Sequence, residues 1–191
     1  MIANLNLWWY TTRSAGIVAW VLLGASVLWG LALSTKVLRG KPRPNWILDL
    51  HRFLGGLALV FTGIHVITIL FDTYVHFGLV EVLVPFTGTW HPTAVAWGII
   101  GLYLLAAVEV TSLLRKRLSK RVWRATHYLS FPLFALTTVH ALTAGTDRTT
   151  VLLRAVMILT AVGVAALTVL RVNKAERHDV LTAPPTGAAT R

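Results

Sequence analysis

The sequence predicts an all-α integral membrane protein, a bundle of five transmembrane helices. The 191-residue chain is 55% hydrophobic and only 13% charged, and its mean hydropathy is +0.68. A soluble protein of this size needs more polar residues to cover its surface. The apolar residues also fall into five runs, each close to the roughly 20 residues that cross the hydrocarbon core of a bilayer.

Polar connections separate the five predicted helices, which cover about residues 14–35, 48–71, 92–114, 125–143 and 150–170. The first 13 residues contain one basic residue, Arg13, and no small-residue cleavage site, so we expect the first helix to be retained. Residues 1–174 are expected to form one transmembrane domain. Residues 175–191, which include Pro184, Pro185 and Gly187, are expected to be a disordered cytoplasmic tail.

The basic residues predict which side of the membrane each connection faces. They gather in the first connection, in the third and after the fifth helix: Lys36, Arg39, Lys41, Arg43, Arg115, Lys116, Arg117, Lys120, Arg121, Arg124, Arg171, Lys174 and Arg177. The second connection, residues 72–91, has no Lys or Arg, and the fourth has only Arg148 beside Asp147. The positive-inside rule therefore places the N-terminus outside and the C-terminus in the cytoplasm.

The same distribution bears on partners. The net charge of +11 comes from short clusters between apolar runs rather than from one basic face, so we expect contact with membrane lipid and not with nucleic acid. The chain has no cysteine, which excludes disulfides, iron–sulfur clusters and Cys-anchored c-type haem. Any metal must be held by histidine, carboxylate or carbonyl groups.

Four histidines lie in two of the predicted helices. His51 and His65 are 14 residues apart in the second, and His127 and His140 are 13 apart in the fourth. These two helices run in the same direction, so His51 is expected to face His127 and His65 to face His140. At 1.5 Å per residue the two levels are roughly 20 Å apart along the helix axes. Two imidazoles at each level could hold two haems, one in each leaflet, which indicates an electron-transfer protein.

Helical periodicity supports this arrangement better on one helix than on the other. Fourteen residues return His65 to within roughly 40° of His51, and small residues lie between them on that face. Thirteen residues leave His140 about 140° away from His127 on an ideal helix. We therefore expect a kink or a tightened turn near Pro132 to bring the two onto one face.

The residues around the histidines resemble a known family. The segments are residues 50–55 (LHRFLG), 65–66 (HV), 123–130 (WRATHYLS) and 139–141 (VHA). They are similar to the ferric reductase-like transmembrane domain superfamily, which includes the NADPH oxidases, the metalloreductases and the haem subunit of the bacterial methionine sulfoxide reductase system. Residues 9–13 (WYTTR) and 141–147 (ALTAGTD) resemble its stand-alone bacterial members. The resemblance extends over about residues 9–171.

The resemblance implies a transmembrane cytochrome b with two b-type haems in a bacterial plasma membrane. The axial iron ligands would be His51, His65, His127 and His140. Arg52 and Arg124, beside the ligands expected near the cytoplasm, and Arg154, near the start of the fifth helix, are candidates to bind haem propionates. Few residues follow the fifth helix and no dinucleotide fingerprint occurs, so flavin is expected only on a partner protein. The donor would be that flavoprotein or quinol.

Two alternatives remain open, one within redox chemistry and one from another class. A quinone-linked haem subunit could feed a periplasmic reductase or repair enzyme. A haem-free transporter could use the histidines to coordinate a divalent cation. In the second connection, Asp72, His76, Glu81 and His91 could form an acceptor or metal site, and Glu109 could relay protons.

Overall fold

The computed structural model describes residues 2–35, 37, 44–72, 75–147 and 149–182. Within these ranges the chain is mainly helical and contains no strand. The elements are α1 (Ile2–Thr35), α2 (Pro44–Leu70), α3 (Leu79–Leu83), α4 (Pro92–Leu113), α5 (Lys120–Tyr128), α6 (Ser130–Ala144) and α7 (Val151–Thr182). The all-α class predicted from the sequence is confirmed.

Four helices of the described chain are long and apolar enough to cross a membrane. The apolar spans are Leu7–Thr35, Asn45–Leu70, Pro92–Leu113 and Val151–Lys174. They correspond to the first, second, third and fifth predicted helices, and they make this a multi-pass membrane protein. The fourth predicted helix is divided between α5 and α6, and α6 alone has 15 residues, fewer than the roughly 20 that cross a hydrocarbon core.

The predicted boundaries differ from the observed ones most at three places, besides starts of α2 and α5 that lie four and five residues earlier than predicted. α1 begins at Ile2 rather than near residue 14, and a short helix, α3, forms within the second connection. α7 continues to Thr182, beyond the predicted end of the transmembrane domain at Lys174. Residues 183–191, the remainder of the predicted tail, lie outside the described residues, as do Lys36, Arg39, Lys41, Arg43 and Arg148.

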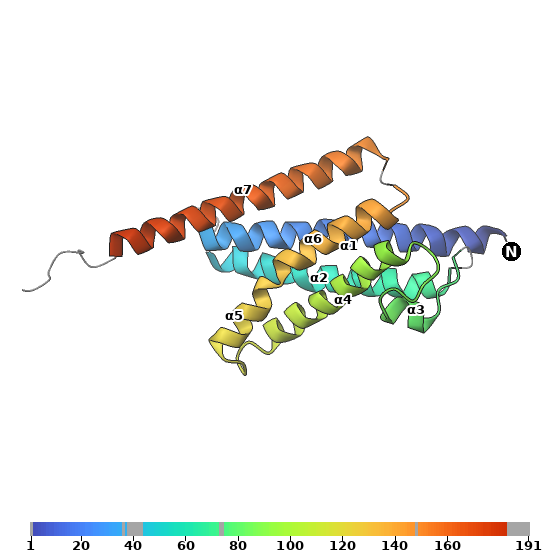
Figure 1. The fold of residues 1–191 in the computed structure, drawn as a ribbon, viewed down its shortest axis with the longest axis horizontal. Helices are drawn as coiled ribbons and strands as arrows, with labels where there is room; N and C mark the ends of the chain where they lie inside the picture. Colours follow the sequence, from blue (N-terminus) through green and yellow to red (C-terminus); the bar gives the residue numbers. More distant parts are fainter. Residues whose placement is uncertain (1, 36, 38–43, 73–74, 148, 183–191) are drawn as a thin grey trace, which may run out of the picture.

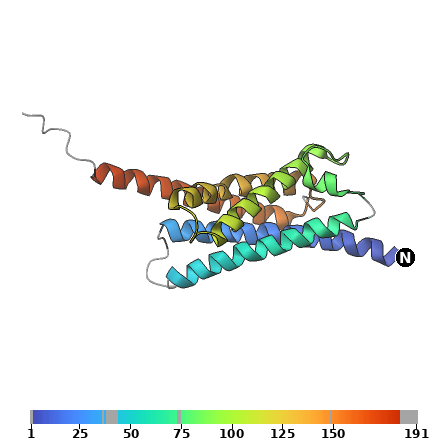
Figure 2. The same ribbon diagram turned by 90° about the horizontal axis from the view of Figure 1, so that it is seen from below.

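The helices form two antiparallel pairs, α1 with α2 and α4 with α6, and α7 packs against α1. α1 packs along α2 and α4 packs along α6, while α1 also contacts α6 and α7. Figures 1 and 2 show α1 and α2 side by side, with α3 near the N-terminal end of α1 and α5 at the opposite end of the bundle. α2 and α6 therefore run in the same direction, as the sequence predicts.

The break between α5 and α6 follows from a single proline. Pro132 has no backbone N–H to donate to the carbonyl of Tyr128, four residues earlier, and its ring clashes with that carbonyl. α5 ends at Tyr128. The Leu129 N–H then bonds to the Thr126 carbonyl at 3.0 Å, an i to i−3 bond that tightens the turn before α6 begins. The expected irregularity near Pro132 is thus confirmed.

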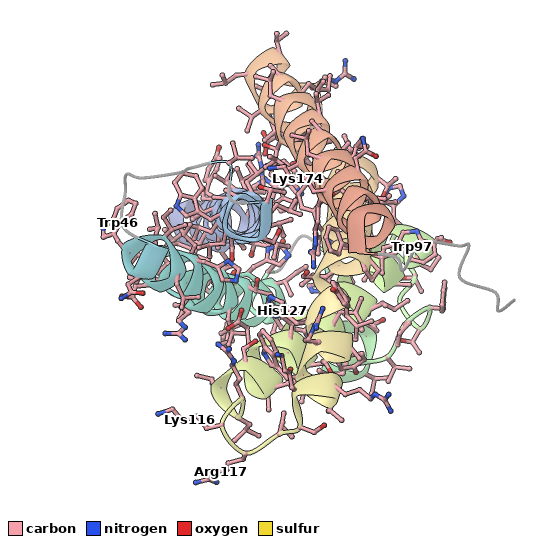
Figure 3. All side chains as sticks on the ribbon, turned by 90° about the vertical axis from the view of Figure 1, so that its left-hand side faces the viewer. Trp46, Trp97, Lys116, Arg117, His127 and Lys174 are labelled. Carbon is pink, nitrogen blue, oxygen red and sulfur yellow. The ribbon has the colours of Figure 1, made fainter. Side chains whose placement is uncertain are left out.

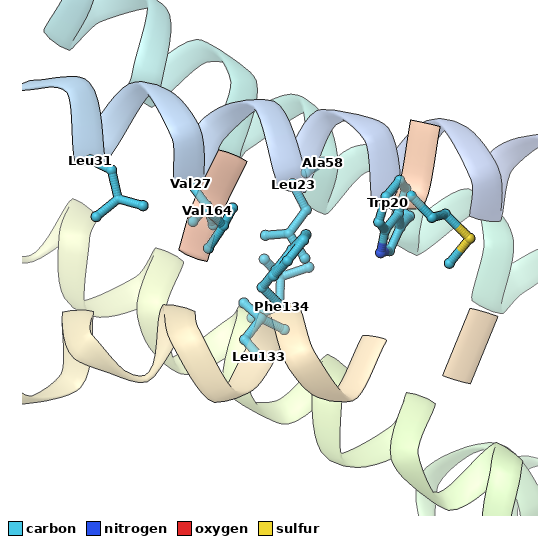
Figure 4. Close-up of a cluster of buried hydrophobic side chains, with 10 residues drawn as sticks. Trp20, Leu23, Val27, Leu31, Ala58, Leu133, Phe134 and Val164 are labelled. Atoms are coloured by element: carbon cyan, nitrogen blue, oxygen red, sulfur yellow. The ribbon is translucent and has the colours of Figure 1, made fainter. Parts of the chain in front are cut away.

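Most of the apolar core lies at levels between the histidine pairs. Figure 4 shows Trp20, Leu23, Val27 and Leu31 of α1 facing Leu133 and Phe134 of α6, with Ala58 of α2 and Val164 of α7 beside them. The Trp20 and Phe134 rings stack with centroids 5.9 Å apart, and the Trp20 indole N–H donates to Thr138 Oγ1 at 2.9 Å. Leu105 of α4 also belongs to this cluster, so side chains from five helices fix the spacing of the bundle.

Basic residues gather at the end of the bundle that carries α5. Figure 3 views this end and shows Lys116 and Arg117 projecting from the α4–α5 loop, with Lys174 on the C-terminal part of α7. Two contacts attach α7 here: Lys174 Nζ donates to the Thr35 carbonyl at 2.7 Å, and Arg171 donates to the Tyr128 hydroxyl at 3.0 Å. We call this the basic end.

Candidate functional site

The structure brings the four histidines together in the two pairs that the sequence predicts. His51 of α2 faces His127 of α5, with ring centroids 5.9 Å apart and ring planes at 82°. His65 of α2 faces His140 of α6, with centroids 6.3 Å apart and planes at 77°. The first pair is nearer the basic end, and the second is nearer the end that carries α3.

Three of the four rings are oriented by backbone carbonyls of a neighbouring helix. A carbonyl can only accept, so each ring donates its Nδ1–H: His51 to Ser26 at 2.9 Å, His65 to Thr12 at 2.8 Å and His140 to Ala94 at 2.8 Å. The tautomer that carries the proton on Nδ1 has a lone pair on Nε2. That is the form in which a histidine binds a metal, with its second nitrogen held by an outer hydrogen bond.

His127 is positioned differently, because it lies on the short helix α5. Its Nδ1 is 3.5 Å from Ser112 Oγ of α4. The Trp123 ring, one helical turn earlier, stacks on the His127 ring with centroids 5.2 Å apart and planes at 24°. Arg115 lies over the other ring of this stack, with its Cζ 4.5 Å from the Trp123 centroid.

Glycines make room for the three carbonyl-bound rings. An added Cβ would come within 2.8 Å of the His140 ring at Gly98, within 2.9 Å of the His65 ring at Gly16 and within 3.1 Å of the His51 ring at Gly30. Each glycine lies four residues after the residue whose carbonyl accepts from that ring. One helical turn of the neighbouring helix thus provides both an acceptor and a space without a side chain.

These glycines were missed in the sequence, although a signal was present. Gly16 and Gly30 are 14 residues apart on α1, the same separation as His65 and His51 on α2. Gly98 and Ser112, which contact the other two histidines, are also 14 apart on α4. When small residues on one helix have the same spacing as the histidines on an adjacent antiparallel helix, they can contact both histidine rings. Such a match indicates which helix packs against the rings.

A cavity adjoins the His65–His140 pair. It has a volume of about 230 Å³ and is lined mainly by apolar side chains, together with both histidines. Arg13 and Asp147 also line it. Arg13 donates to both carboxylate oxygens of Asp147, through Nε at 2.9 Å and through Nη2. This ion pair links α1 to the α6–α7 loop beside the cavity.

The three arginines proposed from the sequence as propionate ligands are all exposed. Arg52 lies 3.6 Å from Asp49 on the same helix. Arg124 donates to the Tyr128 hydroxyl at 3.5 Å. Arg154 lies near the start of α7 and is not among the residues that line the cavity. Arg13 does line the cavity, although the sequence did not single it out as a site residue.

The residues proposed for an outer acceptor site are not brought into one metal-binding group. In the described part of the chain, no three His, Cys, Asp or Glu side chains lie close enough to share a metal ion. His76 and His91 are exposed, whereas Asp72 is buried and lines the cavity. Glu81 accepts the Gly78 N–H at 2.6 Å and so caps α3.

Comparison with known proteins supports the reading of these helices. The family model of the ferric reductase like transmembrane component matches residues 15–138. The match contains His51, His65 and His127 and ends two residues before His140. No curated protein and no solved structure matches the chain. Because the family model covers more than half of the sequence, the chain belongs to the ferric reductase-like transmembrane family.

Proposed function

We propose that this protein transfers electrons across a membrane through two haem b groups, each held by two histidines. A ferric reductase-like transmembrane domain indicates transmembrane electron transfer in general. The observation that carries the finer proposal is the facing of His51 with His127 and of His65 with His140 across the bundle.

The spacing of each pair fits one metal ion between two imidazoles. With metal–nitrogen bonds of about 2 Å and a ring radius of about 1.2 Å, two imidazoles on opposite sides of a metal have centroids roughly 6 to 6.5 Å apart. The observed values are 5.9 and 6.3 Å. The hydrogen bonds at Nδ1 of His51, His65 and His140 leave Nε2 as the ligating atom.

Two side-chain ligands suit haem iron better than a free divalent cation. The porphyrin supplies four nitrogens and needs only the two axial positions, whereas a metal held by protein alone usually takes three or four side chains. The described residues contain no group of three candidate ligands. This favours the haem protein over the transporter that uses its histidines for a metal ion.

The surroundings of the pairs suit a large apolar ring. The cavity beside His65 and His140 is mainly apolar, and Gly98 and Gly101 are among its lining residues. Arg13 places a guanidinium at the same cavity, where a buried carboxylate such as a propionate needs a cation. When bound, a bis-imidazole haem supplies one-electron transfer with no open position for a substrate.

The chain's own contribution is to hold the two redox sites at a fixed separation. His51 and His65 lie 14 residues apart on one straight helix, or about 21 Å along its axis. The core between them, including the stacked Trp20 and Phe134, excludes water and keeps the helices in register. We infer that the basic end faces the cytoplasm and receives electrons from a separate flavoprotein or from quinol, in a bacterial plasma membrane.

The test is the colour and haem content of the purified protein. Expressed with adequate haem supply, it should bind two haems per chain and show the sharp Soret and α bands of low-spin haem b after reduction with dithionite. A colourless protein that binds divalent cations with the same histidines would overturn the proposal. Mixing the oxidised protein with quinol, or with NADPH and a flavin reductase, then identifies the donor class.

A further inference from the structure

One partly buried carboxyl group has no role in the arrangement described so far. Glu109 lies in the last third of α4 and is partly buried. A Cβ added at Gly55 of α2 would lie 2.6 Å from Glu109 Oε1. The carboxyl group therefore crosses from α4 to the backbone of α2. It rests one helical turn from His51, because Gly55 is four residues after that ligand.

The carboxyl group lies at the same level as the serine hydroxyls that contact the two histidines of this pair. Ser26 Oγ would be 3.6 Å from the same added Cβ at Gly55, and it is 3.1 Å from His51 Nδ1. Ser112 is three residues after Glu109, on the same face of α4, and its Oγ is 3.5 Å from His127 Nδ1. Glu109 is thus at the level of the His51–His127 pair.

Among the residues that the structure describes, no counter-charge pairs with this carboxyl group. Within the described chain, Glu109 forms no ion pair or hydrogen bond with another side chain. The ionisable residues at this end of the elements packed against α4, and in the loop that follows it, are Asp49, His51 and Arg52 of α2, Lys120, Arg121, Arg124, His127 and Tyr128 of α5, and Arg115, Lys116 and Arg117 of the loop. Arg52 lies beside Asp49, Arg124 beside Tyr128 and Arg115 over Trp123. α6 has no ionisable residue except His140, at the other level.

We propose that Glu109 takes up one proton when the iron held by His51 and His127 is reduced. This rests on the proposed function. One electron from the flavin or quinol donor adds a negative charge to the site, and the proton from the aqueous phase at the basic end adds a positive one. A carboxylate of low hydration beside added negative charge is strongly disfavoured, because the low dielectric constant screens the repulsion weakly. Protonation of Glu109 removes that repulsion.

The consequence is a reduction potential that depends on pH. When one proton is taken up with one electron, the equilibrium constant for reduction changes tenfold for each pH unit. For a one-electron couple this equals a change of about 59 mV in the reduction potential per pH unit. The potential of the His51–His127 haem should therefore fall as pH rises. The His65–His140 haem, at the other level, should show a much weaker dependence.

The experiment is a potentiometric titration of the two-haem protein at several pH values, followed by its α band. Glu109→Gln should remove most of the slope of one haem and leave the other unchanged. Glu81→Gln, which changes a carboxylate in α3 at the opposite end, should behave as the wild type. Gly55→Ala adds a Cβ that must displace the Glu109 carboxyl group, so it should shift the pH range over which the reduction potential changes. This variant provides the test if Glu109→Gln does not retain haem.

The two proposals fail in different ways. A protein that binds no haem refutes the proposed function. A protein with two haems whose potentials are independent of pH refutes the role of Glu109 alone, and so does an unchanged slope in both Glu109→Gln and Gly55→Ala.

Discussion

Replacing Gly98 with alanine is expected to release the haem held by His65 and His140 while the other haem stays bound. The new Cβ would lie 2.8 Å from His140 Nδ1 and Cε1 and 3.1 Å from its Cγ. Since ordinary contacts between such atoms are about 3.5 to 4.0 Å, the ring must move by roughly 0.7 Å or more. That movement is enough to break the 2.8 Å hydrogen bond to the Ala94 carbonyl.

The size of the effect follows from the loss of that hydrogen bond. Removing the outer partner of a metal-binding histidine typically costs about 10 to 100-fold in metal affinity. Alanine also favours a helix over glycine by about 1 kcal/mol, so the helix itself is not expected to be weakened. Release should therefore come from the displaced ring and not from unfolding.

The assay is haem transfer to an excess of a haem-scavenging protein, measured from the Soret band. Gly63→Ala is the matched control, because an added Cβ there meets nothing within 4 Å. Gly30→Ala, where the closest approach to His51 is 3.1 Å, should release the other haem to a smaller extent. If Gly98→Ala releases haem no faster than Gly63→Ala, the glycine does not provide the space that we assign to it.

Three further predictions test other parts of the site. Pro132→Ala restores a backbone N–H that can donate to the Tyr128 carbonyl, so it should extend α5 into α6 and turn His127 away from His51. The haem content should then fall from two to about one per chain. Two retained haems would show that the break is not needed. Arg13→Gln removes the ion pair with Asp147 and the cation at the cavity, and it should speed loss of the His65–His140 haem several-fold; a larger effect of Arg154→Gln would favour the arginine suggested by the sequence. Ring planes at 82° and 77° predict the strongly anisotropic low-spin electron paramagnetic resonance signal of near-perpendicular imidazoles, and a purely rhombic spectrum would indicate parallel rings.

Much of the fold could be predicted because a membrane imposes few solutions on an apolar chain. Runs of apolar residues mark α1, α2, α4 and α7. The order of the helices then gives the direction of α2 relative to α6, and this direction alone determines that His51 meets His127 and His65 meets His140. Boundaries were less certain, as α1 and α7 show, because polar residues can extend a helix beyond the hydrocarbon core.

The local geometry of the fourth segment needed one correction to ideal helical periodicity. A regular helix would place His140 about 140° from His127. The break at Leu129 allows the two rings to face α2 together, and Pro132 is the residue in the sequence that signals it. The exact position of such a break depends on which carbonyl the proline leaves without a donor, four residues earlier.

The supporting residues could not be predicted because they depend on register between helices. Gly16, Gly30 and Gly98 contact rings on other helices, and Arg13 meets Asp147 across most of the chain. Periodicity within one segment carries no information about such contacts. The same reason applies to His76 and His91, whose nearness in the sequence does not bring them into one metal-binding group among the described residues.

Single replacements of the four histidines test most directly whether each haem is shared between α2 and the α5–α6 segment. We predict that His51→Ala and His127→Ala lose the same haem, and that His65→Ala and His140→Ala lose the other, as identified by α-band position and midpoint potential. Losses that group His51 with His65, and His127 with His140, would contradict the pairing across the bundle.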